Sequence, residues 1–142
     1  HQRAGSGQVL ELHGSLETST CQRCRRQRQT ADFLNLLGEA PQVPRCEVCG
    51  GVYKPDITFF EEALPKQAWL QAESIIEQTD CLVVCGSSLE VYPAAALPER
   101  AVRRGASLIL INRDPTHLDS VAAVVLHEDL AEALPELLGE TA

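Results

Sequence analysis

The sequence predicts an α/β protein: a Rossmann-like, doubly wound parallel sheet, incomplete in this chain, with an inserted small zinc-binding module. Three observations predict this fold class. Continuous apolar runs alternate with amphipathic segments after residue 64, two Cys-x-x-Cys pairs lie before residue 50, and the two regions differ in charge. With 142 residues, of which 44% are hydrophobic, the chain is long enough to bury the core of a globular domain.

Three continuous apolar runs are predicted as parallel strands. They lie in "DCLVVCGSS" (80–88), which breaks at Gly86, in "ASLILIN" (106–112), and in "VAAVVLHED" (121–129). Short apolar runs bounded by Gly or Asn are typical of strands that are buried on both faces. We therefore expect a parallel sheet built from these three segments.

Two further expectations concern strand residues. Cys81 and Cys85 share one face of the first run, and we expect them to pack in the core as free cysteines. "QVLEL" (8–12) is predicted as one more short strand that ends directly at His13.

The segments between the strands are predicted as helices. "LPKQAWLQAESIIEQTD" (64–80) has Pro65 at its start, and its apolar residues recur at helical spacing. The Ala-rich segment 93–104 ends before Gly105, and 130–138 forms a closing helix. Alternating strands and helices favour a parallel, doubly wound sheet.

The two Cys-x-x-Cys pairs predict a structural zinc site. Cys21 and Cys24 form one pair, Cys46 and Cys49 the other, with 21 residues between the pairs. Each pair lets two sulfurs reach one ion from a tight turn, and two pairs complete the tetrahedral shell of structural Zn²⁺. The alternatives are two disulfides or four unrelated cysteines. Metal-type spacing without a secretory feature favours zinc and a reducing, cytoplasmic location.

The charge distribution supports the inserted module. Residues 18–54 hold six Lys or Arg and three Asp or Glu, a net charge of +3, whereas residues 55–142 hold five and fifteen, a net charge of −10. The zinc-binding module (18–54) is thus predicted to interrupt an acidic Rossmann-like domain, incomplete in this chain, made of residues 1–17 and 55–142. The arginines beside the first pair would offset the charge of four thiolates bound to Zn²⁺; they are Arg23, Arg25, Arg26 and Arg28.

Charge and hydropathy argue against two classes of partner. The total net charge of −8 argues against nucleic acid as the main partner, because phosphate binding depends on Lys and Arg. No apolar run approaches the roughly 18–20 residues of a membrane span, so no membrane partner is expected. Because the chain begins with His1 and contains no methionine, we expect it to be a fragment of a longer protein.

Polar residues gather where the predicted strands end. His13, Gly86, Ser87, Ser88 and Asn112 all occupy such positions. Ligands of open parallel sheets bind beyond the carboxyl ends of the strands, so these residues are candidates for one site. Four cysteines already fill a zinc shell, so His13 is not required as a metal ligand.

These segments together resemble the sirtuin family of NAD-dependent protein deacylases. The motifs that carry the resemblance are "HQRAGS", "LHGS", both cysteine pairs, "KPDITFFEEALP", "GSSLEVYPAA" and "LILIN". The resemblance implies that His13 is the catalytic base, that zinc is structural and that NAD is the co-substrate. It also implies acyl-lysine proteins or peptides as substrates.

The resemblance implies further binding residues. The NAD contacts would be Gly86, Ser87, Ser88 and Asn112, with Asp129 or Leu130 near the adenine. "ITFFEE" would pair with the substrate peptide as an added strand, and Thr58, Phe60 and Val91 would line the acyl-lysine tunnel.

The chain also departs from the family pattern. Sirtuins usually have Gly where Glu61 stands and often Val where Thr58 stands, and both differences bear on substrate preference. The family's Gly-Ala-Gly loop and Gln-Asn-x-Asp segment are absent, so we expect this chain to be inactive alone. Two alternatives stay open: a zinc-ribbon interaction module on a non-catalytic nucleotide-binding domain, and a zinc-ribbon nucleic-acid binder.

Overall fold

The computed structural model describes residues 1–38 and 41–139. The chain divides into two compact units, His1–Trp69 and Leu70–Ala142, and each is described by itself. No helix in the described part of the chain is long and apolar enough to cross a membrane. The predicted division into residues 18–54 and the remainder stays a prediction.

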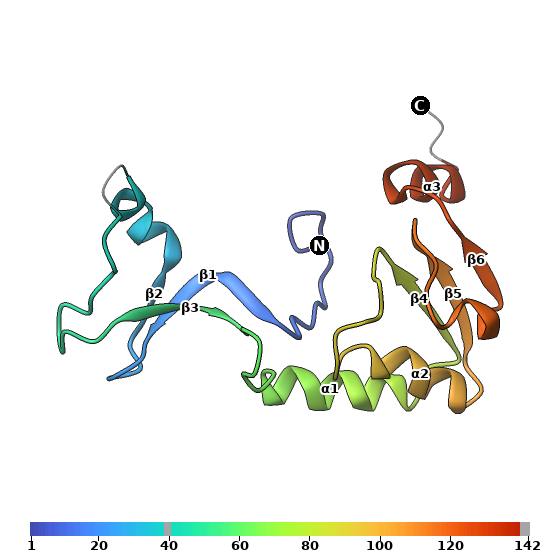
Figure 1. The fold of residues 1–142 in the computed structure, drawn as a ribbon, viewed down its shortest axis with the longest axis horizontal. Helices are drawn as coiled ribbons and strands as arrows, with labels where there is room; N and C mark the ends of the chain where they lie inside the picture. Colours follow the sequence, from blue (N-terminus) through green and yellow to red (C-terminus); the bar gives the residue numbers. More distant parts are fainter. Residues whose placement is uncertain (39–40, 140–142) are drawn as a thin grey trace. The chain divides into compact units, whose positions relative to one another are not determined.

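The first unit is built on a three-stranded antiparallel sheet in the order β2-β1-β3 (Figure 1). In β1, Thr20 pairs with Lys54 of β3 and with Gln27 of β2, so β1 is the central strand. A 3₁₀ helix, η1, follows β2 directly. The elements are β1 (Gly14–Cys21), β2 (Gln27–Gln29), η1 (Thr30–Leu37) and β3 (Tyr53–Ile57).

The strand predicted over residues 8–12 is not formed, and this prediction is wrong. The Glu11 carbonyl accepts a hydrogen bond from the Gly14 N–H at 3.0 Å, and the chain turns there. A strand needs a neighbour for its backbone N–H and C=O groups, and within the described chain residues 8–12 have none. His13 therefore precedes a strand, β1, instead of ending one.

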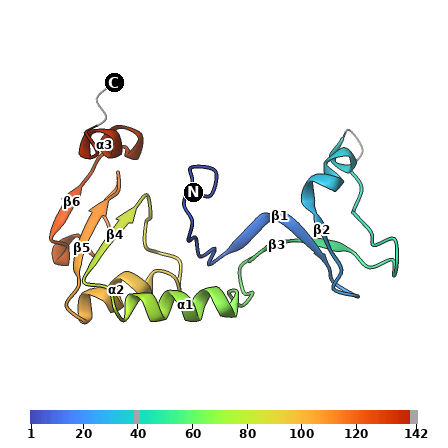
Figure 2. The same ribbon diagram turned by 180° about the vertical axis from the view of Figure 1, so that it is seen from behind.

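The second unit contains the predicted parallel sheet, with strands in the order β4-β5-β6 (Figures 1 and 2). Helix α2 connects β4 to β5 and packs against both strands, which is the crossover that parallel strands require. The third predicted strand is shorter than expected. The elements are α1 (Lys66–Ile76), which begins in the last residues of the first unit, β4 (Cys81–Cys85), α2 (Ala96–Arg103), β5 (Ser107–Ile111), η2 (Asp119–Val121), β6 (Val124–Leu126) and α3 (Leu130–Leu137).

The core of the second unit forms on the central strand β5. Leu108 and Leu110 are each 1% exposed, and they pack with Leu89, Ala95 and Leu118. The apolar run predicted over residues 106–112 therefore forms the buried central strand of this sheet.

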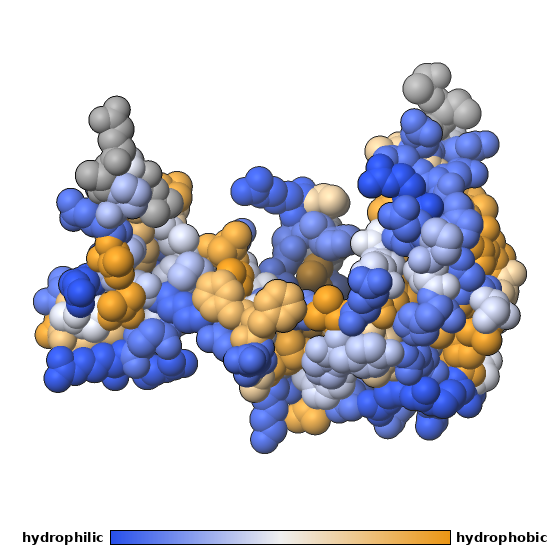
Figure 3. All heavy atoms as spheres, in the orientation of Figure 1, coloured by the Kyte–Doolittle hydropathy of each residue, from blue (hydrophilic) through white to orange (hydrophobic). Residues whose placement is uncertain are grey.

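The expectation that Cys81 and Cys85 are core residues is wrong. Both are exposed, as is Val83 between them, because β4 is an edge strand of the described sheet and these side chains share its uncovered face. Apolar side chains also remain exposed in the first unit, and orange surface is visible on the face of the molecule drawn in Figure 3.

Candidate functional site

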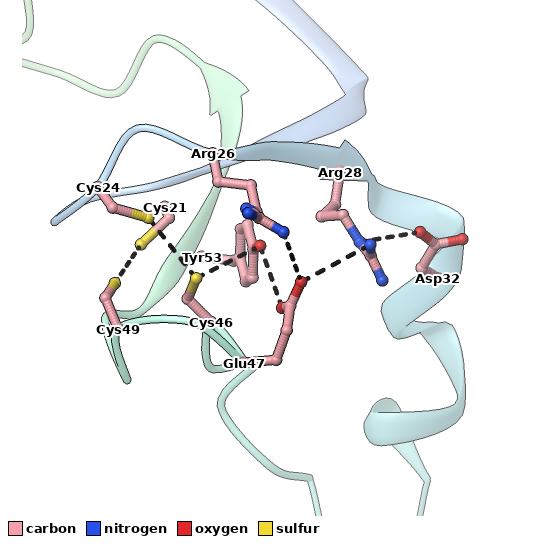
Figure 4. Close-up of polar contacts among 9 residues, drawn as sticks. All are labelled: Cys21, Cys24, Arg26, Arg28, Asp32, Cys46, Glu47, Cys49 and Tyr53. Carbon is pink, nitrogen blue, oxygen red and sulfur yellow. Dashed lines mark hydrogen bonds and ion pairs between the residues drawn. The ribbon is translucent and has the colours of Figure 1, made fainter.

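The four predicted ligand cysteines form one cluster in the first unit. Their sulfur atoms all lie within 4.8 Å of one another, with Cys21 Sγ 3.5 Å from Cys49 Sγ and Cys24 Sγ 3.7 Å from Cys46 Sγ (Figure 4). Four sulfurs at about 2.3 Å from a tetrahedral ion are about 3.8 Å apart. The cluster therefore suits Zn²⁺ in both donor type and spacing.

Two similar turns bring the sulfurs together. The Arg25 N–H donates to the Cys21 carbonyl at 3.0 Å, and the Gly50 N–H donates to the Cys46 carbonyl at 2.8 Å. Arg25 and Gly50 both have positive φ, which closes each turn. Gly51 has another role: a Cβ there would lie 2.8 Å from Cys21 Sγ, so this position must be glycine to leave room for the cluster.

Backbone N–H groups tune the thiols unequally. The N–H of Val48 is the main reason that the pKa of Cys46 is lowered to about 6. The N–H of Gly51 acts in the same direction on Cys49, but burial and the neighbouring sulfurs outweigh it and raise the pKa of Cys49 to about 11. The surroundings of the cluster therefore shift the pKa values of these two thiols in opposite directions.

A second layer of polar groups supports Cys46. The hydroxyl of the buried Tyr53 lies 3.7 Å from Cys46 Sγ and 3.4 Å from Glu47 Oε2, and burial raises the pKa of Tyr53 to about 12. Glu47 in turn forms ion pairs with Arg26 at 3.4 Å and Arg28 at 3.7 Å (Figure 4). These contacts fix the orientation of a ligand residue, as outer groups do at metal sites.

His13 lies outside this cluster. Among residues 1–38 and 41–139 the grouping suited to a metal contains only the four cysteines. The His13 carbonyl accepts a hydrogen bond from the Thr58 N–H at 2.8 Å. The next residue, Gly14, has a φ of +72°, and a Cβ there would lie 2.0 Å from the Asp56 carbonyl oxygen. Backbone contacts alone therefore hold His13 at the start of β1, and its imidazole is exposed.

The segment that follows Thr58 is held by an ion pair that sequence reasoning missed. Lys54 Nζ lies 2.8 Å from Glu62 Oε2 and donates to the Ile57 carbonyl at 2.7 Å. Glu62 Oε2 also accepts from the Phe59 N–H at 2.9 Å. A separation of eight residues carries no local signal for such a pair, because β3 and the following turn must first form.

In the second unit, two of the predicted cofactor residues lie together. Gly86 has a φ of +60°, and its N–H donates to the Ile111 carbonyl at 2.9 Å. A Cβ on Gly86 would lie 2.7 Å from Leu130 Cδ1. The loop after β4 and the start of α3 are therefore in contact, although 43 residues separate them in the sequence.

Asn112 is held at the end of β5 by several contacts. Its N–H donates to the Leu126 carbonyl at 3.0 Å, and its side-chain Nδ2 donates to the Asp114 carbonyl at 2.7 Å. His127, which had no predicted partner, places Nδ1 3.0 Å from the Asn112 carbonyl oxygen and Nε2 3.1 Å from Asp119 Oδ2. The position of His127 directly after the run that became β6, beside β5, was the signal from which these contacts could have been predicted.

The remaining candidates have simpler surroundings. Ser87 Oγ accepts from the Leu89 N–H at 3.3 Å, and Ser88 is exposed. Asp129 caps α3 by accepting from the Ala131 N–H at 2.9 Å. Val91 is 49% exposed. The binding roles assigned to these residues stay predictions.

Comparison with known proteins agrees with the motifs. The model of the Sir2 family matches residues 1–93, which is more than half of the chain. The chain belongs to the Sir2 family. Among its Sir2 relatives, NAD-dependent protein deacetylase 1 of Pyrobaculum aerophilum is 43% identical over 138 residues, which cover 97% of this chain and 54% of the relative.

Two further Sir2 relatives show the same coverage. The NAD-dependent protein deacylase of Mycobacterium tuberculosis strain H37Rv is 42% identical over 144 residues, which cover 97% of this chain and 58% of that protein. The solved structure of Sir2Tm bound to a propionylated peptide is 38% identical, with a TM-score of 0.91 over 99% of this chain and 60% of that chain. The chain thus spans a little more than half the length of the Sir2 proteins it matches.

Proposed function

We propose that the protein containing this chain is an NAD-dependent protein lysine deacylase. It transfers the acyl group of acyl-lysine to ADP-ribose and releases nicotinamide. The observation that carries the proposal is the position of His13 in a Sir2-family chain. The residue is exposed, lies outside the cysteine cluster, and is joined through its backbone to the segment predicted to bind substrate. The names of its relatives, NAD-dependent deacetylases and deacylases, support this reaction class.

In this proposal His13 is the general base. NAD supplies the ribose carbon to which the acyl-lysine oxygen becomes attached as nicotinamide leaves. The imidazole of His13 accepts the proton of a ribose hydroxyl, whose oxygen then bonds to the acyl carbon. Water adds to that carbon and the lysine amine leaves with a proton, which completes the transfer to the sugar. An imidazole suits this role near neutral pH, because its ordinary pKa is about 6.5.

The other candidates divide between cofactor and substrate. Glycine at position 86 would allow the backbone to approach NAD closely, and hydroxyl or amide groups would bond its polar atoms. The proposed NAD contacts are Gly86, Ser87, Ser88, Asn112, Asp129 and Leu130. Thr58, Phe60 and Val91 would contact the acyl-lysine peptide, and solved structures of Sir2 with acetylated peptide support a peptide substrate.

Zinc would be held by the four cysteines and would have a structural role. Four thiolates leave no open position for a substrate, which is the feature that separates structural from catalytic zinc sites. The ion would join the two cysteine turns, and its binding would contribute directly to the stability of the predicted module at residues 18–54.

The test uses the full-length protein, because this chain has no Gly-rich turn for the NAD phosphates and is expected to be inactive alone. Purified protein is incubated with NAD and an acetyl-lysine peptide. We expect nicotinamide, deacetylated peptide and acetyl-ADP-ribose in equal amounts. NAD binding without any of these products would refute the proposal and favour a non-catalytic nucleotide-binding domain with a zinc-ribbon interaction module.

A further inference from the structure

The turn Phe59–Glu62 holds a glutamate in a conformation that favours glycine. The Glu62 N–H donates to the Phe59 carbonyl at 3.1 Å, which closes a four-residue turn. Its third residue, Glu61, has a φ of +70°. Positive φ at the third position is typical of a type II turn, where glycine is preferred because a Cβ is crowded by the backbone.

Neighbouring contacts maintain this unfavourable conformation. Glu62 Oε2 accepts from the Phe59 N–H at 2.9 Å and pairs with Lys54 Nζ at 2.8 Å. Lys54 is anchored in turn by the Ile57 carbonyl and lies 4.6 Å from the centre of the Phe59 ring. The charge of Glu62 is therefore used inside the turn, and the turn does not depend on the side chain of Glu61.

The side chain of Glu61 has no comparable structural role. It is exposed, and no basic residue in the described parts of the chain forms an ion pair with it. Its neighbour Phe60 is 90% exposed. The tip of the turn thus carries one unneutralised carboxylate next to a large aromatic ring. Unfavourable backbone conformations that the surrounding contacts maintain are concentrated at functional sites.

We propose that Glu61 is a specificity-determining residue that selects peptides with Lys or Arg close to the acyl-lysine. This inference rests on the proposed function, in which Thr58 and Phe60 contact an extended acyl-lysine peptide. Side chains of such a peptide would lie beside the tip of the turn. A basic side chain would pair with the carboxylate of Glu61 and pack its stem on Phe60, whereas an acidic side chain would be repelled.

The experiment compares two acetyl-lysine peptides that differ only in carrying Arg or Glu at the positions flanking the acetyl-lysine. The full-length protein is expected to favour the Arg peptide in kcat/KM by about two- to five-fold at low salt, the range of an exposed ion pair. The preference should shrink at high salt, because exposed charges are screened.

Three variants separate charge from conformation. Glu61→Gln removes the charge and keeps the side chain, and Glu61→Gly removes both the charge and the unfavourable φ. Both should lower the preference for the Arg peptide to the same extent. Glu136→Gln, which removes an exposed carboxylate near the end of α3, is the matched control and should keep the preference of the unaltered protein.

The outcomes distinguish this inference from the proposed function. Turnover with an unchanged peptide preference in Glu61→Gln would overturn the inference alone. The same conclusion would follow if Glu61→Gly lost the preference and Glu61→Gln kept it, because the turn conformation and not the charge would then be responsible. Absence of turnover with both peptides would refute the proposed function and the inference with it.

Discussion

The carbonyl of His13 accepts a hydrogen bond from the N–H of Thr58 at 2.8 Å. This contact joins the predicted catalytic base to the second residue of the predicted substrate segment, 45 positions later in the sequence. It uses backbone atoms only. The imidazole is therefore free for chemistry, and the position of the residue does not depend on its side chain.

His13→Ala in the full-length protein should lower deacylase turnover by about 10²- to 10⁴-fold, the usual contribution of a general base. Zinc content and the unfolding temperature should stay unchanged, because the contact with Thr58 is kept. His117→Ala, which removes an exposed histidine paired with Glu99, is the matched control. Near-normal turnover in His13→Ala would contradict the role of base, and loss of zinc would make His13 a ligand.

Gly14→Ala should destabilise the first unit by about 2 kcal/mol or more, because it combines positive φ with a backbone overlap. The new Cβ would lie 2.0 Å from the Asp56 carbonyl oxygen, so β1 and β3 would have to separate. Gly7→Ala is the control, since nothing lies within 4 Å of a Cβ there. Thermal unfolding of both variants measures the difference in stability. Equal stability would show that the close contact of Gly14 with the Asp56 carbonyl is not required.

Cys46→Ser should abolish zinc binding and unfold the region around the cysteine cluster. The unaltered protein should contain one zinc per chain, and the variant should contain none, because metal binding supplies folding free energy to such sites. Cys85→Ser changes an exposed cysteine outside the cluster and should keep the ion. Metal analysis and circular dichroism test both variants; a protein without zinc, or one with a disulfide among the four cysteines, would contradict the site.

Acid should release the turn that carries Glu61. The hydrogen bond from Lys54, with that from the Phe59 N–H, lowers the pKa of Glu62 below its ordinary value of 4.5. The stabilisation of the turn by the Glu62 carboxylate is therefore complete above pH 4.5 and is lost as the pH falls through the lowered pKa. The NMR shift of the Phe59 amide proton should titrate with a midpoint below 4.5, and Lys54→Met should raise that midpoint. An unchanged midpoint in Lys54→Met would contradict this cause, and Glu62→Gln should show no such titration.

Gly86→Ala should weaken NAD binding to the full-length protein by about tenfold or more, because a loss of about 1.4 kcal/mol of binding free energy is enough for that change. Its Cβ would lie 2.7 Å from Leu130 Cδ1 and would push apart two of the predicted NAD contacts. Gly105→Ala is the matched control: its φ is also positive, at +96°, but nothing lies within 4 Å of a Cβ there. Calorimetric titration with NAD compares the two, and equal affinities would count against a cofactor role for this loop.

Local spacing was sufficient to predict several features from the sequence alone. Two residues between paired cysteines place both sulfurs on one turn, so the cluster of Cys21, Cys24, Cys46 and Cys49 followed from the motif. The strands β4 and β5 followed from continuous apolar runs bounded by Gly or Asn, and the helix α1 followed from apolar residues at helical spacing; both are short-range properties. The family was recognisable because such motifs occur in a fixed order along the chain.

Only the tertiary structure decided which residues face distant partners. Residues 8–12 have strand-like composition but no neighbouring strand within the described chain, and Cys81 and Cys85 are exposed because they share the uncovered face of the edge strand β4. The pairing of Lys54 with Glu62, and with it the positive φ of Glu61, depends on how the chain turns after β3. Backbone pairing and side-chain burial are satisfied by partners far away in sequence, so local composition cannot specify them.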